Sequence, residues 1–328
     1  MRAELYRLIR EFFAQRDVLE VETPILSRAG TTDPNIASFS LDASLVLQSP
    51  ASTSPTDRAT SDLRWLRTSP EFALKRLLAS GVGDCYEMGR VFRRGEAGRN
   101  HNPEFTMLEW YRLGWDHRRL MREVTELVFA VSAALGRTVR PSEISYRALY
   151  VQTLGVDPFT ASIDEFKAAL GSQLLDDSGL CRDDWLDLLM THRIQPQLAA
   201  DGLLLVYDYP ASQCALARIR EPDISTAQNQ EPFAVAERFE VYLGSLELAN
   251  GYHELTDATE QRSRFERDLD VRRARGEVSP PIDEALLQAM QHGLPRCAGV
   301  ALGLDRLLMS LLDHDRIAES LAFDWKRS

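Results

Sequence analysis

Residues 93–111 constrain this chain most, because a polar, glycine-broken loop runs directly into a segment with the alternation of a strand. Strand side chains alternate between two faces, so Phe105, Met107, Glu109 and Tyr111 are expected on one face. The loop places arginines beside glycines, which let the backbone approach a ligand closely. A guanidinium offers a planar fork to phosphate oxygens, and a phenyl ring can stack on a purine. The segment predicts a hairpin that can hold a nucleoside triphosphate, although an ordinary solvated turn would have a similar composition.

A second phosphate clamp is predicted near the C-terminus. Residues 299–306 read GVALGLDR, and leucines and a methionine follow at 307–312. This pattern predicts a strand that runs into a helix, with Arg306 in the first helical turn. Gly299 and Gly303 would let a ligand approach the backbone.

Together with Val21-Glu22-Thr23-Pro24, these two stretches resemble the three signature motifs of class II aminoacyl-tRNA synthetases, in the order of that family. Residues 101–109 (HNPEFTMLE) and 247–255 (ELANGYHEL) resemble its lysyl branch. The resemblance implies an α+β fold, in which an antiparallel sheet is flanked by helices. It also implies a homodimer with the first motif in the interface.

The position of the first expected helix indicates which members of the lysyl branch the chain resembles. An amphipathic helix is expected almost from Met1, because Leu5, Leu8, Ile9, Phe12 and Phe13 form an apolar stripe. We therefore expect one catalytic domain over residues 1–328, with a mostly helical insertion at about 120–197 and no anticodon-binding domain. The whole chain resembles the truncated lysyl-tRNA synthetase paralogues that attach (R)-β-lysine to a lysine of translation elongation factor P. ATP, (R)-β-lysine and elongation factor P are the implied substrates, and no tRNA is expected.

Composition agrees with a globular enzyme of the cytoplasm. The chain has 328 residues, is 44% hydrophobic and carries a formal net charge of -11, which argues against a general nucleic-acid binder. The four cysteines have no CxxC pairing and no histidine at zinc spacing, so reduced thiols are expected. Neither a signal peptide nor a membrane span is predicted.

Three further structural expectations follow from local patterns. Residues 48–62, rich in Ser, Thr, Pro and Ala, read as a surface loop. A helix is expected over residues 72–79. After residue 203, short apolar strands are expected to alternate with turns up to the final strand and helix.

Activating a carboxylate with ATP requires positive charge around the reacting phosphate. The resemblance assigns Arg93 to the α-phosphate and places adenine between Phe105 and Arg306. Glu240 and Glu247 lie seven residues apart across an expected strand-turn-strand and could both hold Mg²⁺, although a solvated acidic face would give the same letters. The implied ATP site comprises Arg93, Gly95, Glu96, Asn102, Phe105, Glu247, Leu248, Gly303 and Arg306.

A second pocket must accept a cationic side chain. Glu254 is expected to pair the terminal ammonium of the substrate, with Tyr111 and Asn250 beside it, because a buried ammonium needs a charged partner. Ser69 and Glu71 are expected at the other amino group, although Glu71 could instead stabilise a helix N-terminus. His101 and His253 are expected to be structural hydrogen-bonding residues.

The chain departs from the lysyl-tRNA synthetase pattern in ways that affect this pocket. The hairpin glutamate, Glu96, is shifted by one position, Ala301 stands where the synthetases have glycine, and Ser69 stands where they usually have alanine. The last two changes favour a substrate that differs from α-lysine in the position of its amino group rather than in its side chain. Two alternatives remain open, namely a free-standing lysine-activating enzyme that charges tRNA or a small amine, and a non-catalytic regulatory paralogue.

Overall fold

The computed structural model describes residues 1–43, 63–171, 179–222 and 233–328. Within these residues, the main sheet has nine strands in the order β1-β5-β6-β12-β11-β10-β8-β7, and β9 adds to β10. The strands are β1 (Leu19–Glu20), β5 (Cys85–Phe92), β6 (Glu104–Leu113), β7 (Arg140–Ser145), β8 (Gly202–Pro210), β9 (Ile219–Arg220), β10 (Val235–Leu243), β11 (Leu246–His253) and β12 (Cys297–Gly303). The sheet is antiparallel except at its two ends, where β1 joins β5 and β7 joins β8 in parallel.

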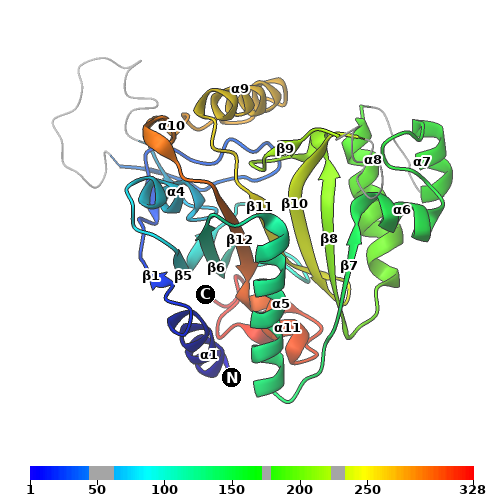
Figure 1. Ribbon diagram of the computed structural model, residues 1–328, viewed down its shortest axis with the longest axis horizontal. Helices are drawn as coiled ribbons and strands as arrows, with labels where there is room; N and C mark the ends of the chain where they lie inside the picture. The colour runs from blue at the N-terminus through cyan, green and yellow to red at the C-terminus, as the bar shows by residue number, and fades with distance from the viewer. Residues whose placement is uncertain (44–62, 172–178, 223–232) are drawn as a thin grey trace.

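Helices pack around this sheet, as Figure 1 shows. They are α1 (Arg2–Ala14), α4 (Glu71–Ala79), α5 (His117–Ala134), α6 (Tyr146–Leu154), α7 (Ile163–Leu170), α8 (Arg182–Leu189), α9 (Ala258–Ala274), α10 (Glu284–Gly293) and α11 (Leu304–Leu311). A small second sheet joins β2 (Leu26–Ser27), β4 (Leu63–Leu66) and β3 (Ser40–Asp42). No helix in the described part of the chain combines the length and the apolar character needed to span a bilayer.

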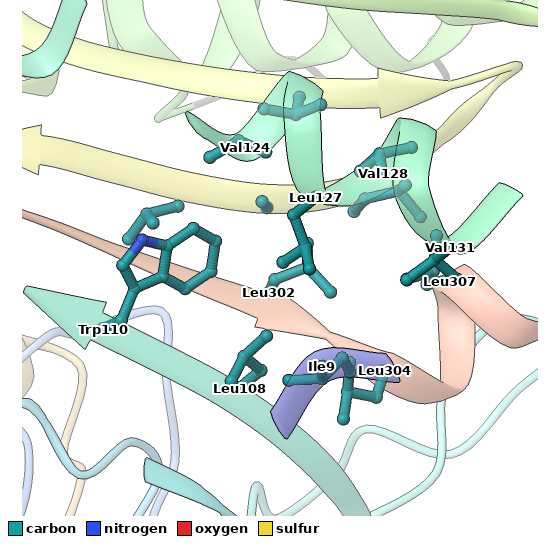
Figure 2. Packing of buried hydrophobic residues seen from close by; sticks show 14 of the residues in the cluster. Ile9, Leu108, Trp110, Val124, Leu127, Val128, Val131, Leu302, Leu304 and Leu307 are labelled. Carbon is teal, nitrogen blue, oxygen red and sulfur yellow. The ribbon is translucent and has the colours of Figure 1, made fainter. Parts of the chain in front are cut away.

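The side chains of β6 point alternately into the hydrophobic core and into the candidate site. Leu108 and Trp110 point into the largest hydrophobic cluster, where they meet α1 and α5 (Figure 2). Met107, Glu109 and Tyr111 line a large cavity instead. The expected alternation is therefore confirmed, and the face predicted to bind a ligand is the cavity face.

Several local expectations are confirmed. Leu5, Ile9, Phe12 and Phe13 of α1 are buried. The helix expected over residues 72–79 is α4, and the strand-to-helix transition before Arg306 is β12 followed by α11. The predicted loop at residues 48–62 lies outside the described residues.

One expectation about organisation needs correction, and another gains detail. Within the stretch 120–197, for which a mostly helical insertion is expected, Leu120, Val124 and Leu127 of α5 belong to the main core and β7 is a strand of the main sheet. The helices that build a separate hydrophobic cluster begin with α6. The stretch after residue 203 also contains two helices, α9 and α10, that were expected as strands and turns. Helix α9 is rich in charged residues and buries few apolar ones, so it lacks an apolar stripe.

Candidate active site

A cavity of about 800 Å³ brings almost all the predicted site residues together. It is lined by residues from β6, β10, β11 and β12, from the loop before β6, and from the start of α4. The predicted residues on its wall are Ser69, Glu71, Arg93, Glu96, Asn102, Phe105, Tyr111, Glu240, Glu247, Leu248, Asn250, Glu254, Ala301, Gly303 and Arg306.

Gly95 is the predicted site residue that does not line this cavity. Its backbone φ is +88°, in the left-handed region that glycine adopts without strain. Gly95 therefore shapes the turn, and its assignment to the ATP site stays a prediction.

Arg93 and Phe105 lie side by side at one end of the cavity. The Arg93 Cζ atom is 5.3 Å from the centroid of the Phe105 ring, which is within cation–π range. Its Nη1 atom is 3.6 Å from Oε1 of Glu96, so the shifted glutamate contacts this arginine. An incoming phosphate would thus meet a guanidinium with one weak carboxylate partner.

Arg306 crosses from the start of α11 to two other segments. Its Nη1 donates to the carbonyl oxygen of Glu247 at 2.8 Å and its Nε to that of Asn100 at 3.3 Å. Its Nη2 lies 2.6 Å from Nε2 of His101. Burial, followed by the charge of Arg306, lowers the pKa of His101 and favours the neutral ring. His101 therefore helps to position the arginine, as expected of a structural residue.

Glu240 and Glu247 lie on adjacent strands, β10 and β11, which pair in a hairpin. Glu240 is 2.5 Å from Nη2 of Arg238 through its Oε1, and the Tyr242 hydroxyl donates to its Oε2. The Glu247 side chain is more open, with 39% of its surface exposed. Despite this exposure, desolvation by the cavity wall and then the negative charge of Glu240 raise the pKa of Glu247. The two carboxylates therefore face the same cavity, as the hairpin pattern predicts.

The acidic pocket is centred on Glu109, which was expected on the ligand-facing side of β6 and, after Glu254, as the next candidate to pair the substrate ammonium. This carboxylate is 2% exposed and accepts hydrogen bonds from the Ser69 hydroxyl at 2.6 Å and the Tyr111 hydroxyl at 2.8 Å. Burial and the nearby charge of Glu71 raise the pKa of Glu109 to about 8. At neutral pH, the protonated form of Glu109 is therefore favoured.

Lys75 is the main residue that sequence reasoning missed. Its Nζ lies 2.6 Å from Oε1 of Glu71 and 2.6 Å from Oε2 of Glu254, and its side chain is 1% exposed. Burial lowers the pKa of Lys75, but the two carboxylates outweigh this effect and raise it, so the ammonium stays charged. Glu254 was expected to be available for the substrate, but it already has a cationic partner in the chain. The spacing of Glu71 and Lys75, four residues apart on a helix, is the signal that could have revealed the pair.

Two rows of paired residues run across the floor of this pocket. Asn250, Ala301 and Glu109 are neighbours on β11, β12 and β6, and Tyr252, Gly299 and Tyr111 form the next row. A Cβ atom on Gly299 would lie 2.2 Å from the Tyr111 ring, so only glycine fits there. Ala301 and Ser69 both adjoin Glu109, which agrees with the expectation that they affect the same end of the substrate. Asn250 donates to the Tyr252 hydroxyl at 3.0 Å.

Residues near both ends of the chain contact residues beside the cavity. The side-chain oxygen of Asn102 accepts a hydrogen bond from the Trp325 backbone N–H at 2.9 Å, and its amide donates to the Glu104 carbonyl at 2.7 Å. Asn102 therefore anchors the C-terminal segment as well as lining the cavity. Arg2 lies 2.5 Å from the buried carboxylate of Asp305, which also accepts from the Thr106 N–H at 2.7 Å. Figure 1 shows the two chain ends close together near α11.

Outside this cavity, one buried group of described residues has the composition of a metal site. The potential ligand atoms of His117, Glu237 and His253 all lie within 4.8 Å of one another. However, Nε of Arg296 donates to Nε2 of His253 at 3.1 Å, which places the ring proton on Nδ1, and that atom is 2.5 Å from Glu237. Both ring nitrogens of His253 therefore form hydrogen bonds, as expected of a structural residue.

Comparison with known proteins gives consistent results over the whole chain. The family model described as "tRNA synthetases class II (D, K and N)" matches residues 1–327. A Mannheimia succiniciproducens protein named elongation factor P–(R)-β-lysine ligase is 43% identical over 324 residues, which cover 98% of this chain and 93% of that protein. Proteins of the same name from Pseudoalteromonas translucida and Vibrio cholerae are each 43% identical, over 331 and 330 residues, and these matches cover 100% of this chain and 95% of each relative.

Proposed function

The chain belongs to the class II tRNA synthetases (D, K and N), and we propose that it activates (R)-β-lysine with ATP and transfers the acyl group to a lysine of elongation factor P. The observation that carries this proposal is a single cavity lined both by Arg93 and Arg306 and by the acidic pocket of Glu71, Glu109 and Glu254. The arginines suit a triphosphate, and the acidic pocket suits a substrate with more than one ammonium group.

The charge of the acidic pocket supports a diamino acid as substrate. When ionised, Glu71, Glu109 and Glu254 carry three negative charges, and Lys75 carries one positive charge, so the net charge is minus two. (R)-β-Lysine has two ammonium groups, which would balance this charge. Glu109 has no cationic partner among the described residues, which makes it our first choice for a direct contact with an ammonium.

In the first step, a carboxylate oxygen of (R)-β-lysine attacks the α-phosphorus of ATP, and pyrophosphate leaves with the electrons of the broken P–O bond. Arg93 would stabilise the charge that develops on the α-phosphate, and Arg306 would hold the triphosphate from the other side. Phe105 would stack on adenine, with Asn102, Leu248 and Gly303 completing the nucleotide site. No proton has to be abstracted, because the attacking carboxylate is already ionised.

The residues present also fit Mg²⁺. Glu240 and Glu247 direct two carboxylates into one cavity from adjacent strands, and their mutual repulsion would be relieved by a divalent cation. When bound, Mg²⁺ would neutralise phosphate charge and orient the triphosphate.

In the second step, the ε-amine of the acceptor lysine attacks the acyl carbon of the adenylate. A C–N bond forms, the C–O bond to AMP breaks, and AMP leaves with that electron pair. The reacting nitrogen starts as an ammonium and loses two protons overall to solvent. We place this reaction in the cytoplasm and expect a homodimer, in keeping with the family resemblance.

The decisive experiment combines the purified chain with ATP, Mg²⁺, elongation factor P and one lysine isomer at a time, followed by intact-mass measurement. We expect elongation factor P to gain one lysyl unit with (R)-β-lysine, and far less with α-lysine. Pyrophosphate exchange without transfer to elongation factor P would favour the free-standing lysine-activating alternative. Absence of exchange with every isomer would favour a regulatory paralogue.

A further inference from the structure

The cavity extends beyond the residues assigned to ATP and (R)-β-lysine. On this side its wall comes from α6, α8, the end of β8 and the turn that follows, which supply Tyr146, Asp183, Asp187, Tyr209, Ser212 and Gln213. Asp183 and Asp187 are four residues apart on α8, so both lie on the same face of that helix. None of these residues has a role in the adenylation step described above.

The two carboxylates of α8 are held in place by neutral donors. The Ser212 hydroxyl donates to Oδ1 of Asp183 at 2.8 Å, and the Gln213 amide donates to Oδ1 of Asp187 at 3.0 Å. In the part of the chain that the structure describes, neither carboxylate forms a salt bridge with a lysine or arginine. Desolvation in the cavity wall raises the pKa of Asp187 to about 6, although the residue is exposed and the charge of Arg238 opposes the rise. Two fixed carboxylates in one cavity wall, without a salt bridge to a described lysine or arginine, are a suitable site for a cationic ligand.

Aromatic rings flank these carboxylates. The rings of Tyr146 and Tyr209 are 4.6 Å apart, and both residues are buried to at least 97% of their surface. Because both rings are almost fully buried, only a small edge of each reaches the cavity beside the carboxylates.

A chain of contacts links this part of the cavity to the proposed reaction centre. Arg238 donates through Nη1 to the Gln213 carbonyl at 2.8 Å and lies 2.5 Å from Glu240 through Nη2. Gln213 in turn holds Asp187. Asp187 is therefore connected, through Gln213 and Arg238, to Glu240, the side chain that would bind Mg²⁺ beside the phosphates.

We propose that Asp183 and Asp187 bind the ammonium of the acceptor lysine of the protein substrate, and so guide this side chain towards the acyl-adenylate. The inference rests on the proposed function, because it requires an amine acceptor. The acceptor must reach the acyl carbon from a side that neither ATP nor (R)-β-lysine fills, and the wall formed by α8 meets this condition.

The test compares two activities of the same variants. Adenylate formation is measured by pyrophosphate exchange with (R)-β-lysine, and transfer is measured as kcat/KM for intact elongation factor P. In Asp187→Asn, and more strongly in Asp183→Asn/Asp187→Asn, we expect transfer to fall roughly tenfold to a hundredfold more than exchange, the range for a lost charged hydrogen bond. The loss should appear mainly in KM for elongation factor P.

Asp184→Asn provides the matched control, because this residue is on the same helix, lies outside the cavity wall and accepts a hydrogen bond from the Cys181 N–H at 2.7 Å. It should transfer at the wild-type rate. Equal losses of exchange and transfer in the Asp183 and Asp187 variants, or wild-type transfer in both, would overturn the inference while leaving the proposed function intact. Failure of the wild-type chain to perform exchange or to modify elongation factor P would instead overturn the proposed function.

Discussion

Replacing Glu254 with glutamine should weaken the fold as well as substrate binding. Glu254 and Lys75 are each 1% exposed and their charged atoms are 2.6 Å apart. Removing one partner of a buried ion pair typically costs about 3–5 kcal/mol, because the other charge is left without compensation. Lys75 keeps Glu71, whose side chain is 17% exposed, so we expect a loss near the lower end, about 3 kcal/mol.

Urea denaturation followed by tryptophan fluorescence would measure this loss as a change in the free energy of unfolding. The double variant Lys75→Met/Glu254→Gln is the informative control, because replacing both partners of a buried pair is often close to neutral. It should recover most of the stability of the wild type but not the affinity for (R)-β-lysine, measured by calorimetry. A Glu254→Gln protein within about 1 kcal/mol of wild-type stability would refute the reasoning. If such a stable variant bound the substrate weakly, Glu254 would pair with the substrate ammonium and not with Lys75.

Three further predictions concern the cavity. Arg306→Ala should reduce pyrophosphate exchange at least about a hundredfold, since one charged clamp on a reacting phosphoryl group contributes about 3 kcal/mol, whereas Arg262→Ala, which removes an exposed ion pair, should not. The affinity of the wild type for (R)-β-lysine should rise between pH 6 and pH 8, because the Glu109 carboxyl, whose pKa is raised to about 8, loses its proton over this range. Calorimetry on Glu109→Gln should show no such dependence of affinity on pH. Ala301→Gly should raise kcat/KM for adenylation of α-lysine relative to (R)-β-lysine, because a methyl-sized misfit costs about 1–3 kcal/mol.

Each of these predictions has a clear contrary result. Normal exchange by a folded Arg306→Ala protein would remove this arginine from the phosphate site. A pH slope that persists in Glu109→Gln would assign the titration to another carboxyl, with Glu254 the nearest candidate. An unchanged isomer ratio in Ala301→Gly would move the discrimination to Ser69.

The parts of the site that lie on regular elements were predictable from the sequence. The alternation of β6 placed Phe105, Met107, Glu109 and Tyr111 on the cavity wall, and the strand-to-helix transition placed Arg306 in the first turn of α11. These predictions hold because a strand or helix fixes the direction of each side chain through its own geometry.

What the sequence did not reveal depends on contacts between distant segments. Glu254, which directly follows β11, meets Lys75 of α4 only in the folded chain, and nothing local to either residue indicates this pairing. Helix α9 was missed because its residues are mainly charged, so the apolar period that marks a surface helix is absent. The membership of α5 in the main core likewise follows from packing against α1 and the sheet, since its apolar stripe would suit either partner.

The attachment of both chain ends to the nucleotide site has a practical consequence for protein production. Trp325 is bonded to Asn102, and Arg2 contacts Asp305, the neighbour of Arg306. An affinity tag fused beside Arg2 or Trp325 would therefore lie close to the loop and the helix that are proposed to bind ATP. Kinetic constants from a tagged enzyme should accordingly be compared with those of protein from which the tag has been cleaved.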